Sequence, residues 1–331
     1  MKTFLLILIS FSVWANEYQR PDIIPYSLHN PYSKSKEVLG LKLFYSRLLD
    51  QKQTVYCGGC HDPNKGYEDN FSLSLGSGHI RAKRHSQSII NLAWAKHYFW
   101  DGRVKTLEEQ VLLPIQSPYE MNISLKKLKA RLNKSPKFKK LFEDAFPGEG
   151  ITSKNISYAL AVFVRGLVSY EAPFDRFIKG DLKAITDSAK RGFKLFRGKA
   201  KCHSCHSGWR FTDDNFYDVG IDSLDEGRGI YEENKKFAFK TPGLREISLR
   251  GPYMHNGSLQ TLEDVIEFFN RGGNVKRKLD ITPLNLTKKE KEDLEAFLLT
   301  LSSGETRIDV ARELSNAKVE WLKWRRKELG Y

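Results

Sequence analysis

This sequence has few cysteines and lacks long apolar runs or long alternations of apolar and polar residues. Beyond the first 15 residues, no apolar run approaches the roughly 20 residues that cross a bilayer. Because alternation marks half-buried strands, its absence favours a mostly α-helical chain with extended loops. The 331 residues are 40% hydrophobic, which is ample for a core. A length prior of about 150 residues per domain suggests two domains.

The first 15 residues carry the only pronounced apolar run. One lysine, Lys2, precedes the run from Phe4 to Val13, and the small residue Ala15 follows it. This pattern predicts a secretory signal peptide over residues 1–15. An uncleaved membrane anchor is the alternative, but the run is shorter than a membrane span. We therefore expect an exported, soluble protein, which in a bacterium is periplasmic.

Positive charge exceeds negative charge, with a formal net charge of +14. Such a balance favours acidic partners through electrostatic steering, or it reflects only a solvated basic surface. Lys and Arg are scattered along the chain, and no basic groove studded with aromatic residues is apparent. We therefore expect no nucleic-acid partner.

All four cysteines lie in two short motifs. CGGCH begins at Cys57, and CHSCH begins at Cys202, 145 residues later. Redox disulfides and zinc are alternatives, but zinc ribbons keep their pairs roughly 15–20 residues apart. Cys-x-x-Cys-His is the attachment sequence of c-type haem, in which two thiols bind the haem and the histidine ligates its iron. The sequence predicts two covalent haem c groups, held by the pairs Cys57 with Cys60 and Cys202 with Cys205, with proximal ligands His61 and His206.

The surroundings of the two motifs repeat each other. GLKLF at Gly40 precedes the first motif, and GFKLF at Gly192 precedes the second. A short polar loop and a glycine-bearing turn follow each motif. The repeat predicts two cytochrome c-like domains, 16–175 and 176–302, followed by a basic C-terminal extension, 303–331. A linker is expected over residues 170–181, where Pro173 and Gly180 interrupt the pattern.

Three helices can be placed within this frame. Thr287 and Glu290 form a capping box before a stripe of leucine and phenylalanine that ends at Leu301. Ser124 caps a second helix. A third carries one apolar face along residues 152–170, made of Ile156, Leu160, Phe163 and Leu167.

Four further stretches are more specific. They are RHSQSIINLAWAKHYFWDGR from Arg84, LEEQ from Leu107, PYEM from Pro118 and FKTPGLREISLRGPYMHNGSLQTLEDVIEFFNRGG from Phe239. With the two cysteine motifs, they resemble the bacterial dihaem cytochrome c peroxidases and their MauG relatives. The resemblance covers roughly residues 36–302.

The resemblance implies a division of labour between the two haems. The haem on His61 is the peroxide site, and the haem on His206 takes electrons from a small redox protein. Trp100 matches the tryptophan between the haems. Glu120 matches the acid–base residue that moves a proton between the peroxide oxygens, and Gln110 matches a polar neighbour that hydrogen-bonds them.

The sequence departs from the family at the distal positions. The histidine that closes the peroxide site matches Ser77, with His79 two residues away as a substitute if the loop shifts. Phe269 stands where the second haem has a distal Met or Tyr, and phenylalanine cannot ligate iron. We therefore expect an open first site. The second haem is then five-coordinate, water-bound or ligated by Met254 or His255.

A third departure concerns calcium, which the family holds between its domains. The matching positions are the side chain of His85 and the carbonyls of Arg250 and Pro252, and the family has asparagine where His85 lies. Because calcium prefers oxygen ligands, the sequence argues against a family-type calcium site.

These observations predict a periplasmic dihaem peroxidase that reduces hydrogen peroxide with electrons from a small periplasmic cytochrome c or cupredoxin. The open first site also fits a MauG-like oxidase that modifies a protein or other substrate. A non-catalytic electron carrier or redox sensor is the alternative of another class. A homodimer is in keeping with the family. The basic tail is either an amphipathic docking helix or a segment that packs Trp321 and Trp324 on the body.

Overall fold

The computed structural model describes residues 16–303. The predicted signal peptide, 1–15, lies outside this range, as does all but the first residue of the predicted extension. None of the helices between residues 16 and 303 has the length and apolar character required to cross a membrane.

Helices dominate the described residues, which confirms the predicted helix-rich fold. The only strands in this part of the chain are β1 and β2, which pair antiparallel with Phe216 opposite Lys240 and Tyr217 opposite Phe239. The α-helices and strands are, in order, α2 (Lys34–Phe44), α3 (Cys57–Cys60), α4 (Leu107–Gln110), α5 (Leu113–Gln116), α6 (Leu125–Asn133), α7 (Pro136–Ala145), α8 (Ser153–Arg165), α9 (Pro173–Ile178), α10 (Asp187–Arg197), β1 (Phe216–Tyr217), β2 (Phe239–Lys240), α11 (Leu262–Arg271) and α12 (Lys288–Leu299). Eight short 3-10 helices lie between them: η1 (Arg47–Leu49), η2 (Pro63–Lys65), η3 (Ser77–His79), η4 (Leu92–Trp94), η5 (Cys202–Ser204), η6 (Arg228–Ile230), η7 (Glu233–Lys235) and η8 (Ile247–Leu249).

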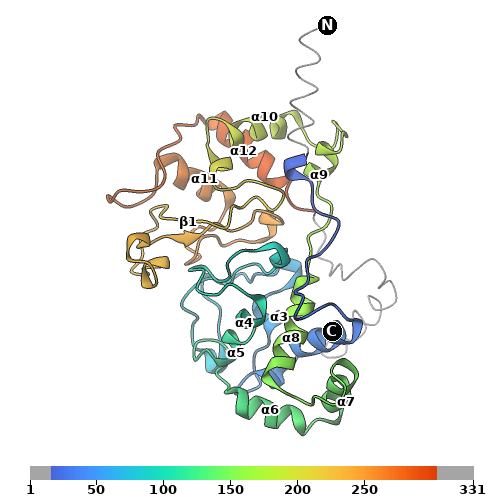
Figure 1. The fold of residues 1–331 in the computed structure, drawn as a ribbon. Helices are drawn as coiled ribbons and strands as arrows, with labels where there is room; N and C mark the ends of the chain where they lie inside the picture. Colours follow the sequence, from blue (N-terminus) through green and yellow to red (C-terminus); the bar gives the residue numbers. More distant parts are fainter. Residues whose placement is uncertain (1–15, 304–331) are drawn as a thin grey trace.

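The core consists of two separate hydrophobic clusters, seen in Figure 1 as a lower group of helices with α3–α8 and an upper group with α9–α12. In the first cluster α2 crosses α8. The Thr152 side chain caps α8 by accepting from the Asn155 amide. The predicted apolar face of this helix is buried, with Ile156, Leu160 and Phe163 each no more than 2% exposed.

The second cluster repeats this plan with α10 and α12. Thr287 and Glu290 form the predicted capping box of α12, and Leu294 and Phe297 pack against α10. The stretch expected to be a linker differs from expectation. Pro173 is the first residue of α9, a position where its fixed φ and missing N–H favour a helix start. Phe174 and Phe177 of α9 then join the second cluster.

Candidate functional site

The first cysteine motif forms a single helical turn, α3, in which the His61 amide donates to the Cys57 carbonyl at 2.9 Å. The Nδ1 atom of His61 lies 3.0 Å from the Tyr67 carbonyl oxygen. Because a carbonyl can only accept, Nδ1 carries the proton, which leaves the lone pair of Nε2 available to a metal.

The second motif has the same geometry. The His206 amide donates to the Cys202 carbonyl at 2.8 Å, and Nδ1 donates to the Phe211 carbonyl at 2.8 Å. Burial lowers the pKa of both His61 and His206, which favours the neutral imidazole that ligates iron. Two free thiols beside an oriented imidazole fit haem c at both places.

A cavity of about 900 Å³ opens beside the first motif. Its lining includes six residues predicted for the first haem, the peroxide chemistry and the relay, namely Cys57, Cys60, His61, Trp100, Gln110 and Glu120. The cavity extends toward the second half of the chain, where Arg210 and Pro242 contribute to its wall. The cysteines and histidine of the second motif are not among its lining residues. The volume is in the range of protein sites that enclose a cofactor.

Glu120 is held in the cavity wall by its backbone. Its amide donates to the Ser117 carbonyl at 3.1 Å, and its carbonyl accepts from the Ser77 amide at 2.6 Å. Gly76 permits this contact, because a Cβ there would lie 2.6 Å from the Glu120 carbonyl oxygen. Burial raises the pKa of the Glu120 carboxyl, partly offset by a hydrogen bond with the Ser117 side chain. Sequence reasoning identified Gly76 only as a turn residue.

Trp100 is fixed from both halves of the chain. Its indole Nε1 donates to the His85 carbonyl at 2.9 Å, and its own carbonyl accepts from the Lys240 amide at 2.7 Å. The His255 ring meets the indole edge-on, with the centroids 6.5 Å apart. The indole therefore lies where the loop after the first motif meets β2.

Comparisons with known proteins agree with this geometry. A family model described as di-haem cytochrome c peroxidase matches residues 34–183. The methylamine utilization protein MauG of Methylorubrum extorquens is 42% identical over 294 residues, which cover 86% of this chain and 83% of the relative. The chain belongs to the di-haem cytochrome c peroxidase and MauG family.

Two other relatives in this family extend the comparison. The cytochrome c551 peroxidase of Pseudomonas aeruginosa is 30% identical over 292 residues, covering 84% of this chain and 82% of the relative. The crystal structure of a MauG-like protein associated with microbial copper homeostasis superposes with a TM-score of 0.80 at 28% identity, covering 89% of this chain and 97% of that one. The chain is thus an oxidoreductase that acts on peroxide, and its cofactors are haem c.

The distal candidates lie in different surroundings. Ser77 is buried, whereas His79 is exposed and does not line the cavity. His255 is buried and stacks on Phe239, with ring centroids 3.6 Å apart. Its Nε2 atom has no hydrogen-bond partner among the described residues. Met254 and Phe269 are both half-buried.

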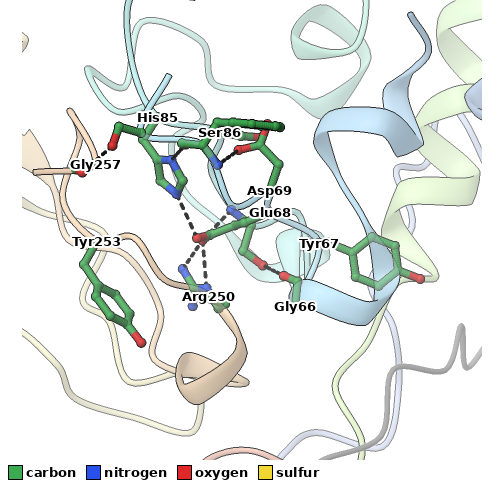
Figure 2. Close-up of polar contacts among 12 residues, drawn as sticks. Gly66, Tyr67, Glu68, Asp69, His85, Ser86, Arg250, Tyr253 and Gly257 are labelled. Atoms are coloured by element: carbon green, nitrogen blue, oxygen red, sulfur yellow. Dashed lines mark hydrogen bonds and ion pairs between the residues drawn. The ribbon is translucent and has the colours of Figure 1, made fainter. Parts of the chain in front are cut away.

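The positions that match the family's calcium site hold a different arrangement. Figure 2 shows the carboxylate of Glu68 lying between the side chains of His85 and Arg250. Sequence reasoning singled out His85 and Arg250 but missed Glu68. Nothing local marks Glu68, because Arg250 lies 182 residues further along the chain.

Proposed function

We propose that this protein is a dihaem enzyme of two cytochrome c-like domains that uses hydrogen peroxide as its oxidant. Cys57 and Cys60 would attach the first haem, and Cys202 and Cys205 the second. The domains would span 16–175 and 176–302, although Tyr18 packs in the second cluster. Two separate cores and two motifs with the same hydrogen bonds support this division.

Glu120 is the proposed proton carrier of the peroxide site. Bound on His61, haem supplies the iron at which peroxide takes up two electrons and, with two protons, yields two waters. The Glu120 carboxylate would accept a proton from one peroxide oxygen and return it to the other. A raised pKa suits this exchange, because it brings the carboxyl closer to the working pH. The Gln110 amide, on the same cavity wall, would orient the oxygens.

Trp100 is the proposed relay between the two haem sites. An indole is polarisable and oxidisable. In Trp100 the ring donates to the His85 carbonyl, and the backbone carbonyl accepts from the Lys240 amide of the other half. We propose that one-electron oxidation passes through the ring. A fixed ring favours such transfer, because its distance to each site stays constant.

The first site is proposed to be open without prior reduction. By the sequence resemblance, Ser77 would match the family's closing histidine, and His79 is exposed and does not line the cavity. The second iron is proposed to be five-coordinate or water-bound unless Met254 or His255 ligates it. The buried, unpartnered Nε2 of His255 makes that residue the stronger of the two.

The cavity that joins His61, Glu120 and Trp100 carries this proposal, and replacing Glu120 tests it. E120Q keeps the shape of the side chain and removes its proton exchange. We expect the reaction of the ferric protein with peroxide, followed by stopped-flow absorption, to slow roughly a hundred- to ten-thousand-fold. E109Q is the matched control, because Glu109 lies exposed on the same helix as Gln110. Equal rates for E120Q and wild type would exclude Glu120 as the proton carrier.

A MauG-like oxidase is the second candidate. It is favoured by the 42% identity to MauG, against 30% to the cytochrome c551 peroxidase. In the peroxidase form, a small periplasmic cytochrome c or cupredoxin would supply both electrons. In the oxidase form, a protein or other substrate would supply them. Rapid oxidation of a pre-reduced small cytochrome c, dependent on peroxide and on this protein, would establish the peroxidase. A long-lived oxidised haem spectrum without turnover would favour the oxidase.

A further inference from the structure

One buried carboxylate holds two cations at the place where the two halves of the chain meet. The Nε and Nη2 atoms of Arg250 lie 2.8 and 2.7 Å from Oε1 of Glu68. The Nε2 atom of His85 lies 3.2 Å from Oε2. The Ser88 amide also donates to Oε1, at 2.9 Å. Both carboxylate oxygens are therefore already paired.

The imidazole of His85 donates from both nitrogens. Its Nδ1 atom lies 2.9 Å from the Phe71 carbonyl, and its Nε2 atom faces the Glu68 carboxylate. Since both partners can only accept, the ring is an imidazolium. Burial alone would lower the pKa of His85, but the hydrogen bond and charge of Glu68 outweigh it and raise the pKa.

This arrangement does not fit calcium. The side chains of His85, Glu68 and Arg250 are 1%, 5% and 7% exposed, so water screens them little. A divalent cation would meet a guanidinium and an imidazolium, and Glu68 would be the sole carboxylate between them. Calcium takes six to eight oxygen ligands.

We propose that the Arg250 guanidinium, paired with Glu68, is a built-in cation where the two halves meet, and that this enzyme needs no calcium. The guanidinium reaches beyond Glu68 to the carbonyl oxygens of Gly243 and Arg245, which its Nη1 atom contacts at 2.6 and 3.1 Å. One planar side chain with five donors can bridge these groups in fixed directions. A segment of the second half is thereby tied to the loop after the first motif.

The Glu68–Arg250–His85 network is connected through short stretches of backbone to His61 and to Trp100. Glu68 follows Tyr67, whose carbonyl accepts from the imidazole of His61. The carbonyl of His85 accepts from the indole of Trp100. The network therefore holds the acceptor of the first proximal histidine and the acceptor of the relay residue in one rigid cluster.

Chelation of the wild-type holoprotein tests the metal-free state directly. We expect metal analysis of protein dialysed against EGTA to find no stoichiometric calcium. The melting temperature, followed by far-ultraviolet circular dichroism, and the ferric haem spectrum should be the same in EGTA and in millimolar calcium. A fall in melting temperature in EGTA that calcium restores would overturn the proposal, whether or not the protein turns over peroxide.

Variants test whether Arg250 does the structural work. R250M leaves Glu68 beside one cation instead of two, and we expect the melting temperature to fall by roughly 10 °C. K140M is the control, because Lys140 also makes two contacts with one carboxylate, that of Asp144, but these side chains are 78% and 48% exposed. It should change the melting temperature little.

The double variant separates a paired network from simple loss of packing. E68Q/R250M removes both members of the Glu68–Arg250 pair together, and only His85 loses a charged partner, so we expect a smaller fall in melting temperature than the two single variants give together. If R250M melts like wild type, or if the single effects simply add, then the pair does not hold the two halves together and the proposal fails.

Discussion

Substitution of Gly192 by alanine should disrupt the second half of the molecule. Gly192 lies in α10 where this helix crosses α12. A Cβ atom there would lie 2.6 Å from the carbonyl carbon of Asp293 and 2.8 Å from Cβ of Phe297, and closer still to the Asp293 carbonyl oxygen. Gly40 occupies the same place in the first half, where its Cβ would lie 2.7 Å from Cβ of Phe163. Both glycines belong to the repeated sequence that precedes each haem motif.

The expected cost follows from these distances. Non-bonded carbon atoms rest at about 3.5–4.0 Å, so the two helices must separate by roughly 1 Å. Overpacking of a core costs about 1–3 kcal/mol. We expect a cost near the upper end of this range, because the obstructing atoms of Asp293 belong to the backbone and cannot rotate away. Replacing glycine with alanine in a helix stabilises the helix by up to about 1 kcal/mol, which offsets part of this cost. The net loss in the free energy of unfolding should therefore be about 2 kcal/mol.

Denaturant unfolding of the haem-loaded protein, followed by circular dichroism and haem absorption, measures this loss. G59A is the matched control, because a Cβ at Gly59 meets only ordinary contacts with Tyr56, at 3.7 Å and beyond. G192A should unfold at lower denaturant than wild type, and G59A should not. If G192A matched wild type in stability, the close crossing of α10 and α12 would not be a constraint and the reasoning would be refuted.

Two further substitutions probe charge and electron transfer. Burial raises the pKa of Glu37 to about 7 despite a hydrogen bond from Tyr32. A carboxyl whose pKa is raised by folding stabilises the folded state fully at low pH, and this contribution is lost as the pH rises through 7. At about 1.4 kcal/mol for each unit of pKa difference, E37Q should therefore gain up to about 3.5 kcal/mol relative to wild type between about pH 4.5 and pH 8. A pH-independent difference in unfolding free energy would contradict this. W100F loses the hydrogen bond to the His85 carbonyl, at a cost of about 1 kcal/mol in stability, and should slow oxidation of reduced cytochrome c far more than the initial reaction with peroxide. Equal slowing of the two steps in stopped-flow traces would argue against a relay through the indole.

Sequence reasoning predicted what local patterns determine. The capping box of α12 and the apolar stripes of α8 and α12 need only a few neighbouring residues, and both helices lie where the sequence placed them. The family resemblance predicted that Trp100, Gln110 and Glu120 share one site with the first cysteine motif, and all three line the cavity beside it.

Long-range packing was beyond such reasoning. Pro173 and Gly180 were interpreted as linker residues, yet α9 begins at Pro173, because Phe174 finds a buried place against Tyr18 and α10. The repeat around Gly40 and Gly192 was visible in the sequence. The reason for glycine at these two positions is the close approach of a second helix, which no neighbouring residue indicates. The pairing of Glu68 with Arg250 joins positions too distant for any local signal.

On the proposed arrangement, the buried electrostatics would let two haem sites keep a fixed relation without a calcium ion between them. Trp100 is held by one hydrogen bond from each half, so its place depends on how the loop at His85 meets the strand at Lys240. We propose that Arg250 fixes that meeting, because it pairs with Glu68 of the first half and also contacts carbonyl oxygens of its own half. A guanidinium in this place cannot be removed by a chelator or exchanged for another ion. A calcium ion can bind and leave, and so can regulate the distance between the two sites. A cation that belongs to a side chain can only maintain that distance.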